Sequence, residues 1–159
     1  MRVVSAAAIA EAVRALCVEA CCVLPESVVR RLREARDGEA EGSAARAVLT
    51  QLIENARLAR EAMRPCCQDT GMAVVFLDIG RGAYIDGDVY AAVNEGVSRG
   101  YREGYLRKSV LHPLTRENTG DNTPAVVHLS FVPGDRVRVQ VAPKGFGSEN
   151  TVSYTHLTL

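Results

Sequence analysis

Through the first third of the chain, apolar residues recur every three or four positions, which is the spacing of one face of an α-helix. The first such face consists of Ile9, Val13, Leu16 and Ala20, and the pattern stops before Pro25. Proline suits the first turn of a helix, so a second helix is expected there, with Val28, Val29 and Leu32 facing inward. Ser43 is positioned to cap a third helix. The apolar side of that helix is expected to consist of Val48, Leu49, Leu52, Ile53, Ala56 and Leu58.

The pattern changes after residues 64–65. Residues 72–79 (MAVVFLDI) are almost continuously apolar, which predicts a buried strand. Asp86 is expected to cap a helix that ends near Gly100 or Gly104. Two more strands are predicted at residues 125–132 and 136–142, and the Pro-Gly-Asp sequence between them predicts a hairpin turn. Together these elements predict a mixed α/β (α+β) fold, with an N-terminal helical layer followed by a mixed sheet with helices.

The composition fits one domain and argues against two classes of partner. Among 159 residues, 47% are hydrophobic, and 19 basic residues balance 19 acidic ones. Without a net positive field the chain is not expected to bind nucleic acid. Glu11, Arg14 and Glu19 interrupt the apolar N-terminal stretch, so neither a signal peptide nor a membrane span is predicted. We therefore expect a cytoplasmic protein that is not bound to a membrane.

The five cysteines fall into two groups. Cys17, Cys21 and Cys22 lie in a helical pattern, where cysteine commonly serves as a small buried hydrophobic residue. Cys66 and Cys67 lie instead at a junction between elements, directly before Gln-Asp-Thr-Gly. A thiolate is a soft ligand suited to iron–sulfur clusters, and a neighbouring carboxylate can move a proton. The alternative from the residues alone is a capped turn with an incidental cysteine.

Two other polar segments adjoin apolar elements, where sites are often built. Arg107 presents a planar guanidinium that matches a carboxylate, although a solvated surface pair with Lys108 is the alternative. Asn118, Asp121 and Asn122 precede a strand and are typical of turns.

A third segment, residues 144–150 (KGFGSEN), contains two glycines whose backbone N–H groups can face an anion. It lacks the spacing of a nucleotide-binding P-loop.

Five segments together resemble a known family. CQDTG, AVNEGVSRGYREGYLRKSV, NTGDNTPAVVH, VPGDRV and VAPKGFGSEN occur in this order. Their order and spacing resemble the α subunit of class I (iron–sulfur) fumarate hydratases and the related L(+)-tartrate dehydratases. The resemblance runs from the first helix to Asn150 and covers the N-terminal part of that subunit.

This resemblance implies a hydro-lyase that adds or removes water on a small dicarboxylate (fumarate/malate). A [4Fe–4S] cluster held by three cysteines would act as the Lewis acid. Cys67 matches the first of these ligands. Gln68 and Asp69 match residues that contact the substrate, and Asp69 is the candidate proton-transfer group. Arg107 matches an arginine that clamps a carboxylate, and Gly147 matches a glycine whose backbone lies against the substrate.

The sequence also departs from the family pattern. No cysteine follows Cys67, so two cluster ligands are expected outside this sequence, and Cys66 replaces a residue that is usually aliphatic. Residues 1–150 are interpreted as a truncated part of the α-subunit domain, and residues 151–159 as a tail unlike the family, in which His156 receives no role. A β subunit or C-terminal domain is expected to complete the site, within a dimer of αβ units.

Two alternatives stay open at this stage. One is L-tartrate dehydratase activity, because the two substrates differ by a single hydroxyl. The other is a catalytically silent fragment or assembly module, and the present chain alone is expected to be inactive.

Overall fold

The computed structural model of this chain describes residues 1–147. Within these residues, three of the four helices lie in the N-terminal part, and strands with one further helix follow them, which confirms the mixed α/β prediction. They are β1 (Arg2–Ser5), α1 (Ala6–Cys22), α2 (Glu26–Gly38), α3 (Ala44–Ala62), β2 (Met72–Gly80), β3 (Ala83–Asp86), α4 (Val89–Glu103), β4 (Val126–Val132) and β5 (Val137–Lys144).

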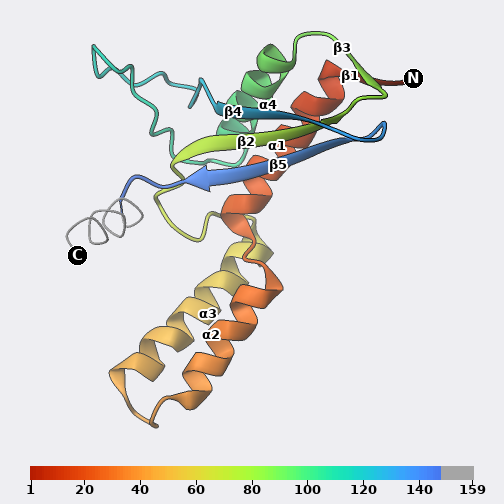
Figure 1. Cartoon of the computed structure of the whole chain (residues 1–159). Helices are drawn as coiled ribbons and strands as arrows, with labels where there is room; N and C mark the ends of the chain where they lie inside the picture. The colour runs from red at the N-terminus through yellow and green to blue at the C-terminus, as the bar shows by residue number, and fades with distance from the viewer. Residues whose placement is uncertain (148–159) are drawn as a thin grey trace, which may run out of the picture.

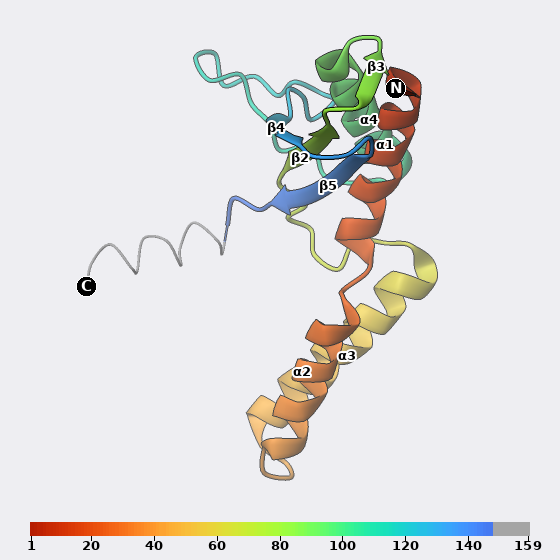
Figure 2. The same cartoon turned by 45° about the vertical axis from the view of Figure 1, so that its right-hand side comes forward.

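The main sheet has three strands in the order β4-β2-β5. The apolar strand β2, predicted as a buried strand, is the central one, with β4 parallel on one side and β5 antiparallel on the other. Helices α1 and α4 lie together on one face of this sheet (Figures 1 and 2). The short strands β1 and β3 form a separate parallel pair that the apolar pattern does not predict.

The hairpin expected between β4 and β5 is wrong in its pairing. The chain does reverse at residues 133–136, but β2 lies between the two strands, so neither pairs with the other. The turn crosses the end of β2, where Gly80 N–H donates to Arg136 O at 2.8 Å and Gly82 N–H donates to Gly134 O at 2.8 Å. A Cβ on Gly80 would lie 2.6 Å from Gly134 O, so glycine permits this crossing.

The core forms where α1, α4 and the inner face of β2 meet. Its completely buried members include Val13 of α1, Val75 of β2 and Val97 of α4. Gly96 and Gly100 lie one turn apart on α4, and a Cβ on either would come within 2.9 Å of α1 atoms. The two helices therefore pack closely through glycine. Three cysteines predicted to be buried are part of this core: Cys17, Cys21 and Cys22 are 1%, 8% and 0% exposed.

Side-chain caps set the beginnings of three helices. Ser5 and Ser43 accept the backbone N–H groups of Ala8 and Arg46, and the second of these confirms the predicted cap of α3. The predicted cap of α4 is wrong by two residues. Asp86 pairs with Ser5 as the last residue of β3, and Asp88 caps the helix by accepting Ala91 N–H at 3.0 Å.

Helices α2 and α3 pack on each other and extend away from the sheet as a two-helix arm (Figure 1). Of the α2 residues expected to face inward, Val29 is buried but Val28 is 41% exposed. Helix α2 packs mainly on the single helix α3, so it buries only a narrow face. On α3, Val48, Leu52 and Leu58 are likewise exposed rather than inward. In the described part of the chain, no helix is both long and apolar enough to cross a membrane.

Candidate active site

The segment that carries Cys67 leaves the end of α3 and leads into β2. Met63 ends α3 in the left-handed conformation, with φ of 48°. The following loop is anchored where Cys66 N–H donates to Cys21 O at 2.9 Å. Cys67 is exposed, and its Sγ accepts the backbone N–H of Asp69 at 3.4 Å. Gln68 is also exposed. The loop therefore presents a thiol and an amide on its outer surface.

Asp69 ties this loop to the glycine-rich segment that follows β5. Its Oδ2 accepts the N–H groups of Phe146 and Gly147, each at 2.9 Å, and its Oδ1 accepts Gly71 N–H at 3.2 Å. These hydrogen bonds hold the pKa of the Asp69 carboxyl below its ordinary value, and the one from Gly147 has the largest effect. The positive charge of Arg107 makes a smaller contribution in the same direction. Asp69 is therefore a carboxylate with three backbone donors at neutral pH.

Gly71 permits this arrangement. It has φ of +56°, and a Cβ at this position would lie 1.9 Å from Lys144 O. Only glycine fits such a close approach between two backbones. The start of β2 consequently lies against the end of β5, which brings Asp69 to Phe146 and Gly147.

Arg107 follows α4 on a segment without regular secondary structure. Its backbone carbonyl accepts the Thr70 hydroxyl at 2.9 Å, so the segment is fixed directly beside the Asp69 loop. The Arg107 side chain is exposed, and within residues 1–147 its guanidinium makes no hydrogen bond or ion pair. Its charge nevertheless contributes to lowering the pKa of Asp69. An unpaired guanidinium near a backbone-bound carboxylate can receive a carboxylate ligand.

Two buried polar residues that connect these segments are missed by the sequence analysis. Asn122 is completely buried, and its amide bridges Gly71 O to the N–H groups of Ser109 and Val110. The Tyr101 hydroxyl donates to Thr70 O at 2.7 Å. The turn interpretation holds for Asn118 and Asp121, which accept Gly120 N–H and Thr123 N–H. The sequence alone does not distinguish Asn122 from these neighbours.

The remaining thiols differ from Cys67 in their surroundings. Burial raises the pKa of Cys17 and of Cys21 to about 12, so both are protonated, whereas metal ligation requires the thiolate. Cys66 is partly buried, with its Sγ 3.6 Å from Cys22 O, and burial raises its pKa too. Among residues 1–147, no group of three or more histidine, cysteine, aspartate or glutamate side chains could hold a metal ion. Cys67 is thus a single ligand candidate.

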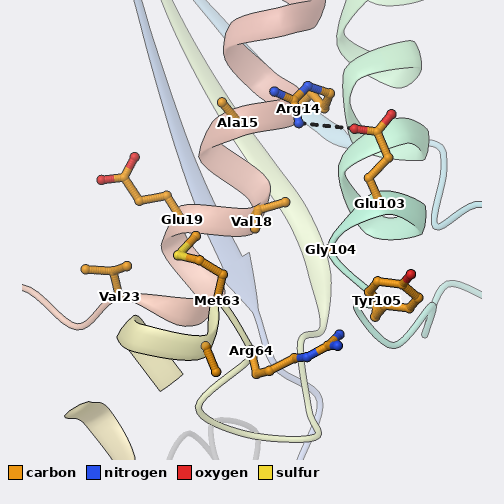
Figure 3. Close-up of a pocket in the computed structure, with 11 residues that line it drawn as sticks. Arg14, Ala15, Val18, Glu19, Val23, Met63, Arg64, Glu103, Gly104 and Tyr105 are labelled. Atoms are coloured by element: carbon orange, nitrogen blue, oxygen red, sulfur yellow. Dashed lines mark hydrogen bonds and ion pairs between the residues drawn. The ribbon is translucent and has the colours of Figure 1, made fainter. Parts of the chain in front are cut away.

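A separate hollow lies elsewhere on the molecule. A cavity of about 670 Å³ opens between α1, the end of α3 and the end of α4. Figure 3 shows its lining, with Arg14 paired to Glu103, and Arg64 stacks over the Tyr105 ring at 4.8 Å. None of the five predicted site residues lines it. The candidate site is instead an open surface of loops.

The structure brings the five predicted site residues onto three neighbouring segments. Asp69 is bonded to Gly147, is two residues from Cys67, and is within electrostatic reach of Arg107. Gln68 lies on the same loop, exposed, and within residues 1–147 its side chain makes no hydrogen bond to the other two segments. Residues 148–150 of the glycine-rich segment, and the tail expected at residues 151–159, lie outside the described residues.

Comparisons with known proteins give matches over most of the chain. The family model for fumarate hydratase (Fumerase) matches residues 10–159. The chain is 39% identical to the putative L(+)-tartrate dehydratase subunit alpha of Methanocaldococcus jannaschii over 83% of this chain and 48% of that protein.

Two fumarate hydratases are also similar. The chain is 37% identical to the aerobic class I fumarate hydratase of Escherichia coli K12 over 65% of this chain and 19% of that protein. It is 30% identical to the putative class I fumarate hydratase of Geobacillus stearothermophilus over 88% of this chain and 28% of that protein. The chain thus spans about half the length of the first relative and less of the other two.

Proposed function

We propose that this chain, which belongs to the fumarate hydratase (Fumerase) family, supplies part of the active site of a hydro-lyase acting on a small dicarboxylate. The observation that carries the proposal is the meeting of three loops at Asp69. An exposed thiol precedes it by two residues, and a glycine loop is hydrogen-bonded to its carboxylate. The guanidinium of Arg107, which has no partner within residues 1–147, helps to lower its pKa. A cluster ligand, a proton carrier and a carboxylate clamp would then be adjacent.

The donor set fits one ligand of a [4Fe–4S] cluster. Cys67 is exposed, and its sulfur already accepts one N–H, as cluster thiolates commonly do. The other ligands would come from the rest of the complete enzyme, since the other cysteines of this chain are buried or partly buried. When bound, the cluster would supply a Lewis acid for the substrate hydroxyl.

Arg107 would bind one substrate carboxylate. The Thr70 hydroxyl holds the backbone carbonyl of Arg107, so the position of the Arg107 backbone is fixed relative to the Asp69 loop. Two parallel N–H donors match the two oxygens of a carboxylate. Gln68 would add a neutral hydrogen bond, and Gly147 would place its backbone beside the substrate because Asp69 holds it there. These residues orient the substrate before any bond changes.

Asp69 would move the proton. Dehydration of a 2-hydroxydicarboxylate removes a proton from one carbon and hydroxide from its neighbour, and leaves a double bond and water. An ionised carboxylate can accept that proton, and hydration returns it. The three backbone N–H donors stabilise the ionised carboxylate, which makes Asp69 a weaker base. The competing role for Asp69 is therefore a structural one, in which its carboxylate holds the glycine-rich loop.

Fumarate/malate is the proposed substrate pair, and L-tartrate is the second candidate. L-tartrate is favoured by the Methanocaldococcus relative, whose name specifies tartrate. This chain covers 48% of that protein but only 19% of the Escherichia coli fumarate hydratase. A β subunit or a C-terminal domain would complete the site, in a dimer of αβ units located in the cytoplasm.

A direct assay tests this proposal. The complete enzyme is purified and loaded with its cluster without oxygen, and loss or gain of water is followed with fumarate, malate and L-tartrate. The proposal expects turnover of at least one of them, with the ratio of kcat/KM values deciding between the candidates. A fully loaded enzyme with no turnover of any of the three would overturn the proposal and favour a silent assembly module.

A further inference from the structure

A single buried amide joins the Cys67–Asp69 loop to the Arg107 segment. Asn122 Nδ2 donates to Gly71 O at 3.0 Å, while its Oδ1 accepts Ser109 N–H at 2.7 Å and Val110 N–H at 3.1 Å. Gly71 is two residues from Asp69, and Ser109 is two residues from Arg107. The relative placement of the two segments therefore depends directly on this side chain.

The chemistry of the bridge requires asparagine. One side must donate to a carbonyl and the other must accept from two N–H groups, and a carboxamide does both. The residue is 0% exposed, so water cannot replace a lost partner. Its φ of +65° is a conformation that asparagine and glycine tolerate better than most residues. Both backbone and side chain thus fit this position.

A second set of hydrogen bonds connects the same two segments. Thr70 is 3% exposed and donates its hydroxyl to Arg107 O, while Tyr101, 1% exposed, donates to Thr70 O. The Asn122 side chain is buried, but it is not part of the apolar core cluster. Its hydrogen bonds go to the two site segments, whereas Asn94 Oδ1 accepts the Ala125 N–H at 2.9 Å, directly before β4, and makes no hydrogen bond to either site segment within residues 1–147.

We propose that Asn122 is a positioning residue for the reaction, which sets the distance and orientation between the Arg107 guanidinium and the Cys67–Asp69 loop. This inference rests on the proposed function. Misplacement of a catalytic group by about 1 Å can cost about 10²-fold in rate. Releasing the bridge is therefore expected to lower kcat/KM by about tenfold or more, with a rise in KM because the carboxylate clamp is displaced.

Two substitutions separate positioning from local turn formation. Asn122→Gly keeps the positive φ and removes both halves of the bridge. Asn122→Asp keeps the acceptor for Ser109 and Val110 but cannot donate to Gly71 O as a carboxylate. A residue that only shapes its own turn predicts normal kcat/KM per cluster for Asn122→Asp. A positioning residue predicts a loss in both variants. Asn94→Ala is the matched control and should keep wild-type kinetics.

Amide hydrogen exchange on the chain without its cluster gives a readout that needs no activity. In both Asn122 variants, protection should fall at the amides that Asp69 accepts from, those of Gly71, Phe146 and Gly147. Asn94→Ala should leave this protection unchanged.

The outcomes are distinct. Loss of kcat/KM and of this protection in both Asn122 variants supports the inference. Wild-type kinetics per cluster in the two variants, or protection of the three amides unchanged by them, overturns it. An inactive wild-type enzyme overturns the proposed function instead, and the exchange experiment then still decides whether Asn122 controls the loop.

Discussion

The carboxylate of Asp69 accepts the Gly147 N–H at 2.9 Å, although 78 residues separate the two in the sequence. This hydrogen bond connects the loop before β2 to the loop after β5. It joins two of the three polar segments of the candidate site, and it gives Asp69 a structural role in addition to the proton transfer proposed for it.

Replacing Asp69 by asparagine tests which role limits the enzyme. Asn can still accept the N–H groups of Phe146 and Gly147, but it cannot take up a proton. General acid–base groups contribute about 10²–10⁴-fold, so kcat per cluster should fall by at least about 10²-fold with cluster content retained. Asp121→Asn, which alters an ordinary turn carboxylate, is the control. If kcat per cluster is unchanged while the melting temperature falls, Asp69 acts only by holding the loop.

The lowered pKa of Asp69 also predicts an acid dependence of stability. A carboxyl whose folded pKa lies below its unfolded value stabilises the fold above the unfolded value, near 3.8. That contribution is lost as the pH falls through the lowered folded pKa. The difference in unfolding free energy between wild type and Asp69→Asn should therefore shrink as the pH is lowered through this range. Urea unfolding of the chain at several pH values measures it, and a difference independent of pH contradicts the assignment.

Arg107→Lys keeps the charge but removes the planar pair of donors. In the complete enzyme we expect kcat/KM to fall by about tenfold or more, equivalent to about 1.4 kcal/mol or above. Arg138→Lys is the matched control, since Arg138 is a surface cation 3.8 Å from Asp78 on the sheet. Identical kinetics for the two variants would make Arg107 a surface cation as well.

The elements of the fold were largely predictable because their signals are local. The spacing of Ile9 and Val13, the cap at Ser43 and the apolar run of β2 each act within a few residues. The sequence interpretation failed where distant pairing decides the outcome. Asp86 belongs to β3 because β1 pairs with this strand. Strand β5 pairs with β2 rather than with β4, because β2 lies between them in the sheet.

The candidate site shows the same division. Spacing alone left Cys67 and Arg107 with ordinary alternatives, and the family resemblance selected them. The Asn122 bridge was not predictable, because an asparagine before a strand is typical of a turn and its partner Gly71 is 51 residues away. Non-local hydrogen bonds of this kind leave no local pattern in the sequence.

The isolated 159-residue chain is expected not to hold a stable [4Fe–4S] cluster after anaerobic reconstitution. It offers one exposed thiol, while such clusters require several cysteine ligands. Iron and sulfide analysis after gel filtration measures the outcome. A stoichiometric cluster on the isolated chain would contradict the assignment of Cys67 as a single contributed ligand.

The most direct test compares two adjacent cysteines in the complete enzyme. Cys66→Ala and Cys67→Ala are prepared without oxygen, and iron, sulfide and visible absorbance are measured per protein. Cys66 is partly buried against Cys22 O, so its variant should keep the cluster. Cys67 is exposed beside Asp69, so its variant should lose the cluster and the hydro-lyase activity together. Full cluster content in Cys67→Ala would contradict the account.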